Sequence, residues 1–133
     1  MVTHATNNPK TICRTLSMSS SRTWQQRFQD MLDSAQRILR YTRGMTYQNF
    51  IDDRRTLDAV LHNFAVIGES ANRIPHEIRA RLPDVPWRDM VGMRIIIVHI
   101  YFRIKDPHIW RAVTELPSLM RQLEDFLASP QTS

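Results

Sequence analysis

The sequence predicts an all-α fold, an up-down bundle of four main helices with one or two short helices. Only 3 of its 133 residues are glycine, fewer than the turns of a β-sandwich or barrel require. Apolar residues recur at spacings of three, four and seven, and proline or capping residues separate these segments. We expect one domain over residues 22–129, between a disordered polar tail at 1–21 and a short tail at 130–133.

The first expected helix begins at Thr23, which can form a capping box with Gln26. It should end at Gly44, a residue suited to a helix C-terminus, just after Arg40 and Arg43. Apolar residues at helical spacing form its core face: Trp24, Phe28, Met31, Leu32, Ala35, Ile38 and Leu39.

A second long helix follows a short helical turn that is expected over residues 47–51. Asp52 or Asp53 caps this helix, and Pro75 ends it because proline cannot continue a helix. A short basic helix is expected next, over residues 76–81. The core face of the long helix is again apolar: Leu57, Val60, Leu61, Phe64, Ile67, Ala71 and Ile74.

The third and fourth main helices complete the expected bundle. The third starts near Trp87, and Asp106 with Pro107 caps the fourth. Pro117 must kink or divide the fourth helix, because it lacks a backbone N–H. Apolar residues again mark the core face: Ile109, Trp110, Val113, Leu116, Leu119, Met120, Leu123, Phe126 and Leu127.

Charge and cysteine content limit the classes of function that the sequence supports. The net charge is +5, but residues 1–22 carry three basic residues and no acid, which leaves a net +2 on the rest. Cys13 alone can form neither an internal disulfide nor a thiolate zinc site, and the histidines lack metal-site spacing, so we expect no metal or cofactor. No segment has the length of a membrane span or the form of a signal peptide, which predicts a cytoplasmic protein without a membrane partner.

Two polar side chains interrupt the otherwise apolar segment 93–102: Arg94 and His99. Side chains five residues apart on a helix point about 140° apart, and Tyr101 shares the face of Arg94. A buried arginine needs a counter-ion, for which Glu69 in the second helix is a candidate. Taken alone, these residues are more readily interpreted as a structural ion pair and a buried histidine than as a catalytic site.

The segment Gly92-Met93-Arg94, four residues, His99, one residue, Tyr101-Phe102 resembles the R-x4-H-x-Y motif of the HEPN-domain, HepT-like toxins. The likeness extends from Arg22 to about Ala128. Collinear segments carry it beyond the short motif: Asp58-Ala59-Val60, Asn63 to Glu69, Ile74-Pro75, Val85-Pro86-Trp87 and Ile109-Trp110.

The resemblance implies a HEPN-like bundle and a metal-independent endoribonuclease toxin. A toxin of this family is expected to act as a homodimer, in which the motif helices of the two subunits meet and form the RNA-cleaving cleft. The matching catalytic residues are Arg94, which can stabilise phosphate charge in the transition state, and His99, which can exchange a proton with the 2′-hydroxyl or the leaving oxygen. The family's antitoxin partner is a nucleotidyltransferase, which in some pairs adenylylates (AMPylates) the tyrosine that matches Tyr101 and so silences the toxin.

Two residues depart from the family pattern beside this motif. Ile95 replaces a residue that is commonly asparagine, and Ile100 replaces one that is commonly aspartate. Loss of an orienting acid can leave His99 wrongly placed for catalysis. The alternative function is therefore a catalytically weakened or inactive dimer that acts as an interaction module for a nucleotidyltransferase.

Other polar residues are open to a structural or a functional interpretation. Glu69 is a supporting site candidate or a structural partner for Arg94, and Asn63 is a supporting candidate that is equally open. The basic residues Arg73, Arg79 and Arg81 are interpreted as a solvated face, because acidic residues lie close to them in the sequence.

Overall fold

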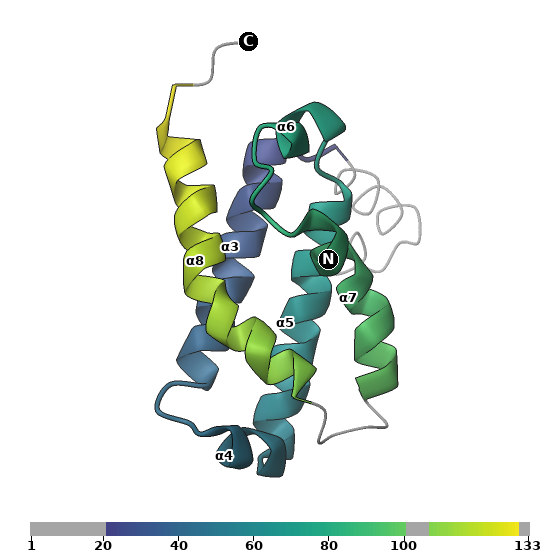
Figure 1. Ribbon diagram of the computed structural model, residues 1–133, viewed down its shortest axis with the longest axis vertical. Helices are drawn as coiled ribbons and strands as arrows, with labels where there is room; N and C mark the ends of the chain where they lie inside the picture. Colours follow the sequence, from purple (N-terminus) through teal and green to yellow (C-terminus); the bar gives the residue numbers. More distant parts are fainter. Residues whose placement is uncertain (1–20, 101–106, 131–133) are drawn as a thin grey trace, which may run out of the picture.

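The computed structural model describes residues 21–100 and 107–130, and all regular secondary structure in that part of the chain is helical. The all-α prediction is confirmed. The residues of the expected N-terminal tail up to residue 20, and Asp106, lie outside the described residues. Figure 1 labels six helices: α3 (Trp24–Tyr41), α4 (Tyr47–Asp52), α5 (Arg54–Asn72), α6 (His76–Ala80), α7 (Trp87–Ile100) and α8 (His108–Ala128).

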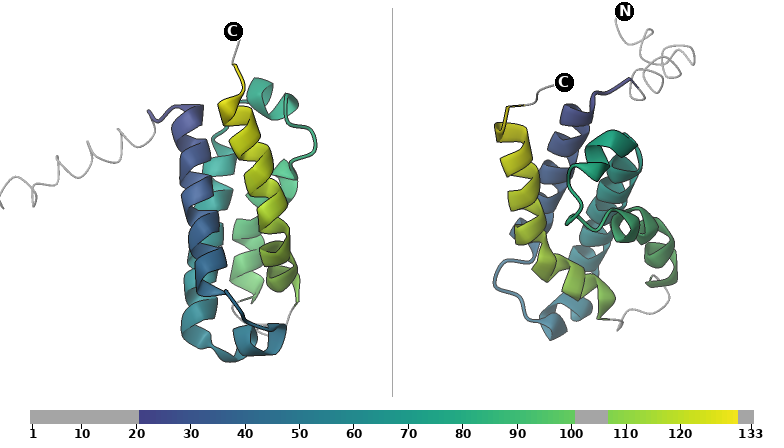
Figure 2. Two further views of the ribbon diagram at one scale, coloured as in Figure 1. Left: turned by 90° about the vertical axis from the view of Figure 1, so that its left-hand side faces the viewer. Right: turned by 45° about the horizontal axis from the view of Figure 1, so that its top comes forward.

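Helix α5 is the centre of the bundle, packed against α3 on one side and α7 on the other. Helix α8 lies along α3, as both views in Figure 2 show, and α4 closes the end of the bundle where α3 ends and α5 begins. Aromatic rings join three helices: Phe28 of α3 lies 6.1 Å from Trp87 of α7 and 6.0 Å from Phe126 of α8, between ring centroids. The tryptophans are packing residues, as predicted.

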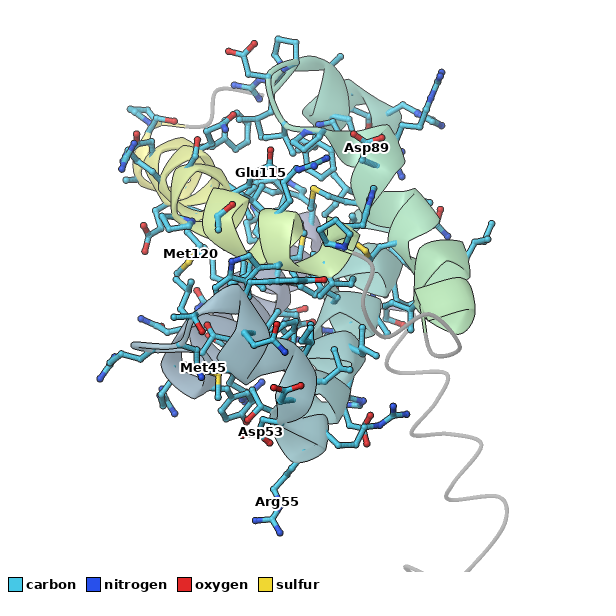
Figure 3. The ribbon with its side chains drawn as sticks, turned by 60° about the horizontal axis from the view of Figure 1, so that its bottom comes forward. Met45, Asp53, Arg55, Asp89, Glu115 and Met120 are labelled. Atoms are coloured by element: carbon cyan, nitrogen blue, oxygen red, sulfur yellow. The ribbon has the colours of Figure 1, made fainter. Side chains whose placement is uncertain are left out.

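Side-chain caps fix the starts of three helices. The Thr23 hydroxyl accepts from the Gln26 backbone N–H at 3.1 Å, and the Gln26 side chain accepts from the Thr23 N–H at 2.9 Å, so the predicted capping box is present. Thr46 and Asn49 form a second capping box, at the start of α4, which was not predicted. Asp53 rather than Asp52 caps α5, at the end of the bundle that Figure 3 brings forward.

The end of α3 differs from the prediction by three residues. The helix ends at Tyr41, because the Thr42 hydroxyl donates to the Ile38 carbonyl at 2.9 Å and closes the last turn. Gly44 instead supplies a backbone φ of 75° in the following turn, where a side chain would be strained.

Pro117 does not divide the last helix. Helix α8 continues through it and bends in its middle in Figure 1. Pro107 is its N-cap residue and provides no side-chain cap. In the described part of the chain, no helix combines the length and the apolar character that crossing a membrane requires.

Candidate functional site

Helix α7 carries the two predicted catalytic positions on one continuous stretch of backbone. It begins at Trp87, whose indole N–H donates to the Leu82 carbonyl at 3.0 Å and ties the helix start to the preceding loop. Met90 and Met93 are buried in the core that α7 shares with α5. The backbone of residues 94 and 99 is helical, whereas Tyr101 lies outside the described residues, so the structure does not test the predicted roles of these side chains.

The outward side of α7 carries an exposed isoleucine as well as two exposed charged residues, Arg88 and Asp89. Ile95, one of the residues that departs from the family pattern, is 67% exposed. Val91 and Ile97 are half-buried on the same helix. A helix with apolar side chains on several faces is typical of a segment that another surface covers.

Glu69 lies on α5, where it is half-buried and accepts from the Arg73 Nε at 3.1 Å, one helical turn away. This pair is a partly exposed i,i+4 ion pair of modest strength. Asn63 is buried on the same helix, and its Nδ2 donates to the Ala59 carbonyl at 2.8 Å. Both supporting candidates thus make a bond within α5, which favours a structural contribution from each.

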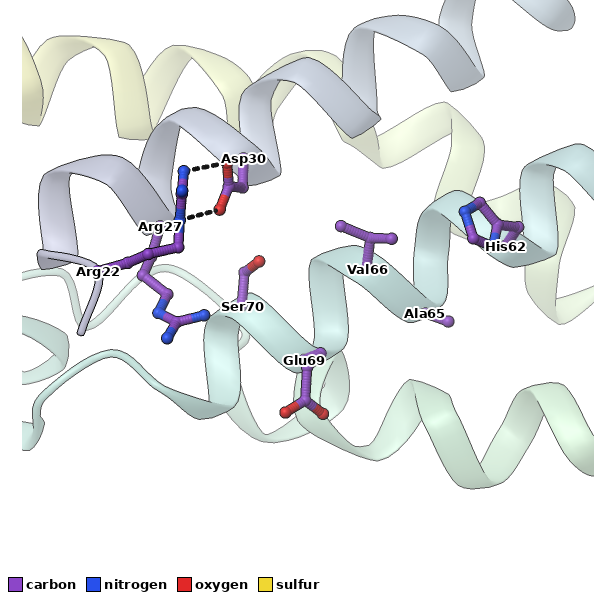
Figure 4. A pocket seen from close by; sticks show the side chains of 8 residues that line it. All are labelled: Arg22, Arg27, Asp30, His62, Ala65, Val66, Glu69 and Ser70. Carbon is purple, nitrogen blue, oxygen red and sulfur yellow. Dashed lines mark hydrogen bonds and ion pairs between the residues drawn. The ribbon is translucent and has the colours of Figure 1, made fainter. Parts of the chain in front are cut away.

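A groove of about 550 Å³ runs between α3 and α5 (Figure 4). Arg22 forms a two-bond ion pair with Asp30 on one wall, at 2.8 and 2.9 Å. Arg27 is only 9% exposed, and burial lowers its pKa, followed by repulsion from Arg73 and Arg22. The lining residues come from α3, the segment before it, and α5: Arg22, Arg27, Asp30, His62, Ala65, Val66, Glu69 and Ser70.

Sequence reasoning did not identify the buried polar residues of these two helices. Arg27 and Ser34 are buried on α3, seven residues apart, and Asn63 and Ser70 are buried on α5 at the same interval. Seven residues are two helical turns, so each pair occupies one face of its helix. That repeated interval was visible in the sequence and could have revealed the buried polar line.

Arg79 corrects the interpretation of a solvated basic face. Its guanidinium donates to the carbonyls of Ala71, Asn72 and Ile74, each at 3.0 Å, and so caps the C-terminus of α5. The same group lies 5.9 Å from the ring centroid of Trp87. Arg79 therefore joins α5, α6 and the start of α7, a role that depends on the turn between α5 and α6 and that charge patterning does not reveal.

A second hollow, of about 740 Å³, lies between α5, α7 and α8. Met90 and Met93 contribute to its apolar floor, and Asp89, His108 and Glu115 to its polar rim. Within the ranges 21–100 and 107–130, no group of three His, Cys, Asp or Glu side chains could hold a metal ion.

Comparison with known proteins identifies the family of this chain. The family model for the HepT-like ribonucleases, described as "Ribonuclease HepT-like", matches residues 31–126. The chain belongs to the HepT-like ribonuclease family. That match includes the whole of α7 and most of the bundle, so the recognition made from the sequence is confirmed.

Relatives of this chain are named as ribonucleases in two archaea. It is 34% identical over 96 residues to "Putative RNase MJ1380" of Methanocaldococcus jannaschii, covering 71% of this chain and 88% of the relative. It is 32% identical over 97 residues to "Probable ribonuclease HepT" of Thermococcus cleftensis, covering 72% and 88%. No solved structure matches the chain significantly.

Proposed function

We propose that this chain is a metal-independent endoribonuclease, and that it acts in the cytoplasm as the toxin of a toxin-antitoxin pair. The observation that carries the proposal is the position of Arg94 and His99 on one helix inside the region that matches the ribonuclease family. The relatives named as ribonucleases cover the same region.

The proposed chemistry needs no metal. The imidazole of His99 takes the proton from a 2′-hydroxyl or gives one to the leaving oxygen. The guanidinium of Arg94 binds the phosphate and stabilises the charge that develops on it in the transition state. These two side chains differ enough in chemistry that neither can replace the other.

A homodimer is part of the proposal, with the α7 helices of two copies facing each other across the RNA-binding cleft. The exposed Ile95 and half-buried Val91 support this arrangement, because a second copy would remove their apolar surface from water. Glu69 and Asn63 then support the site from α5, next to α7.

Regulation is proposed at Tyr101 by a partner nucleotidyltransferase. Transfer of an adenylyl group to its hydroxyl would add a bulky anion two residues after His99. That anion would repel RNA phosphates and fill the cleft.

The second candidate function is an inactive dimer that serves as an interaction module for the nucleotidyltransferase. Ile95 and Ile100 favour it, since both stand where the family commonly has polar residues. This candidate predicts a well-folded dimer that leaves RNA intact.

Expression in bacteria tests the proposal. The wild-type chain should arrest growth and degrade cellular RNA, whereas Arg94→Ala and His99→Ala should do neither at equal soluble protein. Arg121→Ala and His76→Ala are matched controls, because both side chains are exposed and lie on helices other than α7. Normal growth and intact RNA with the wild-type chain would contradict the ribonuclease proposal and favour the interaction module.

A further inference from the structure

Helix α3 ends in a cluster of exposed basic and aromatic side chains, which we name the α3 patch: Arg37, Arg40, Tyr41 and Arg43. Arg37, Arg40 and Tyr41 stand at positions i, i+3 and i+4, so they share one side of the helix. Tyr41 is 40% exposed, and it and Ile95 are the exposed large hydrophobic residues in the described part of the chain.

No guanidinium group of the α3 patch forms an ion pair within the described residues, although the carboxylate of Asp33 lies one helical turn before Arg37. The ion pairs in this part of the chain join Arg22 to Asp30, Arg54 to Asp58, and Arg73 to Glu69, and none includes a patch residue. Of the nearby acids, Asp33 accepts from Gln29 and Asp52 accepts from Gln48. The three guanidinium groups are therefore available to an external anion.

A structural explanation accounts for only part of this cluster. A cation in the last helical turn interacts favourably with the helix dipole, and Arg40 occupies that turn. This effect fades within a turn and does not explain an exposed tyrosine among three arginines. Arginine and an accessible aromatic ring together are typical of surfaces that bind single-stranded nucleic acid.

The α3 patch lies at the end of the bundle where α7 also ends. In Figure 1 both helices run toward the α4 end, with α5 between them, and Figure 2 agrees. Position 99 is in the last turn of α7. Arg55, at the start of α5, extends away from the same end in Figure 3, where Asp52 and Asp53 also lie.

We infer that the α3 patch binds single-stranded RNA and holds the substrate strand beside the end of α7. The guanidinium groups of Arg37, Arg40 and Arg43 contact backbone phosphates, and a base stacks on the ring of Tyr41. Contacts of this kind do not distinguish base sequences, so the patch contributes affinity rather than sequence preference. This inference rests on the proposed ribonuclease function and adds a substrate-binding surface to it.

Binding of a fluorescent 2′-O-methyl oligouridine to the full chain tests the inference, because this probe lacks the hydroxyl needed for cleavage. Replacing Arg37, Arg40 and Arg43 by glutamine should weaken binding at least tenfold and lower the salt slope of log K by about 2. Tyr41→Ala should weaken binding about tenfold and leave the salt slope unchanged. The matched control replaces Arg81, Arg111 and Arg121, which changes net charge equally at exposed sites outside α3 and α7.

The inference is overturned if the control triple variant loses as much affinity as the patch variant, or if Tyr41→Ala binds like wild type. Circular dichroism checks that each variant is folded. Cleavage of unmodified RNA by the wild-type chain and by the His99→Ala variant is measured in parallel. Binding that depends on the patch, without cleavage, would support the patch but contradict the proposed nuclease. Cleavage together with binding that does not depend on the patch would support the nuclease but contradict the patch.

Discussion

Helices α3 and α7 both pack against α5, yet their surfaces differ. Helix α3 is strongly amphipathic, with Phe28, Met31 and Ile38 fully buried and polar side chains on the opposite side. Helix α7 has buried methionines but also an isoleucine, Ile95, that is 67% exposed. The packing of one chain accounts for the pattern of α3, whereas part of the pattern of α7 is explained by the proposed second copy.

The comparison separates the residues that stabilise the bundle from those whose positions the bundle does not explain. Residues that only stabilise a bundle follow the helical period, so their positions are predictable from that period. Two exposed residues do not follow that period, Ile95 on α7 and Tyr41 at the end of α3, and the proposals above give each of them a partner outside the chain.

The largest effect should come from the core side of α3. Phe28→Ala removes a ring with no exposed surface that contacts Trp24, Trp87 and Phe126. We expect it to lower the free energy of unfolding by about 3–5 kcal/mol, measured by chemical denaturation. A loss below about 1 kcal/mol would show that this aromatic cluster does not hold the bundle together.

The next largest effect should be on association through α7. Ile95→Lys places a charge in the proposed dimer interface, so we expect the dissociation constant to rise at least a hundredfold, measured by analytical ultracentrifugation. Gln36→Lys is the matched change on the exposed side of α3 and should leave association unchanged. An equal rise of the dissociation constant in both variants would contradict the proposal that α7, and not α3, forms the dimer interface.

A smaller effect should follow from loosening α7 at its start. Arg79→Ala removes three hydrogen bonds to the end of α5 and the contact with Trp87, at a cost of about 2 kcal/mol in unfolding free energy. Arg79→Lys should recover only part of this, because an ammonium lacks the planar fork. Arg88→Ala is the control, since its side chain is exposed and its removal leaves the α5 carbonyls bonded. Full recovery by lysine would mean that charge alone matters.

The smallest effect concerns pH. Hydrogen bonds from the Thr56 backbone N–H and hydroxyl lower the pKa of Asp53 below its usual value of 3.8. Its charge therefore stabilises the fold above that value, and the contribution disappears as pH falls through the lowered pKa. Urea denaturation at a series of pH values measures this contribution. The difference in unfolding free energy between wild type and Asp53→Ala should shrink steadily below about pH 4. A difference that grew with acidification would contradict this capping account.

Much of the fold could be predicted because it depends on short-range rules. The Thr23 capping box, the start of α7 at Trp87 and the apolar faces follow from residues within a few turns of one another. The cap that Arg79 places on α5 could not be predicted, since it depends on how α6 folds back. Arg27 was missed because a charged residue beside Phe28 is usually solvated.

The candidate site was predictable in a different way. The spacing of Arg94 and His99 has meaning through the family pattern, whereas helical periodicity alone allows a structural ion pair equally well. In the proposal, the groups that complete the site come from another helix and from another copy. No local rule contains that information.

Cleavage of RNA by the purified chain tests the central claim that α7 carries a metal-independent active site. A fluorescent oligoribonucleotide should be cut at the same rate with and without EDTA, and at least a hundredfold more slowly by His99→Ala. The all-DNA version should stay intact, because it lacks the 2′-hydroxyl. Intact RNA with a well-folded wild-type dimer, or equal cleavage by His99→Ala, would contradict the claim.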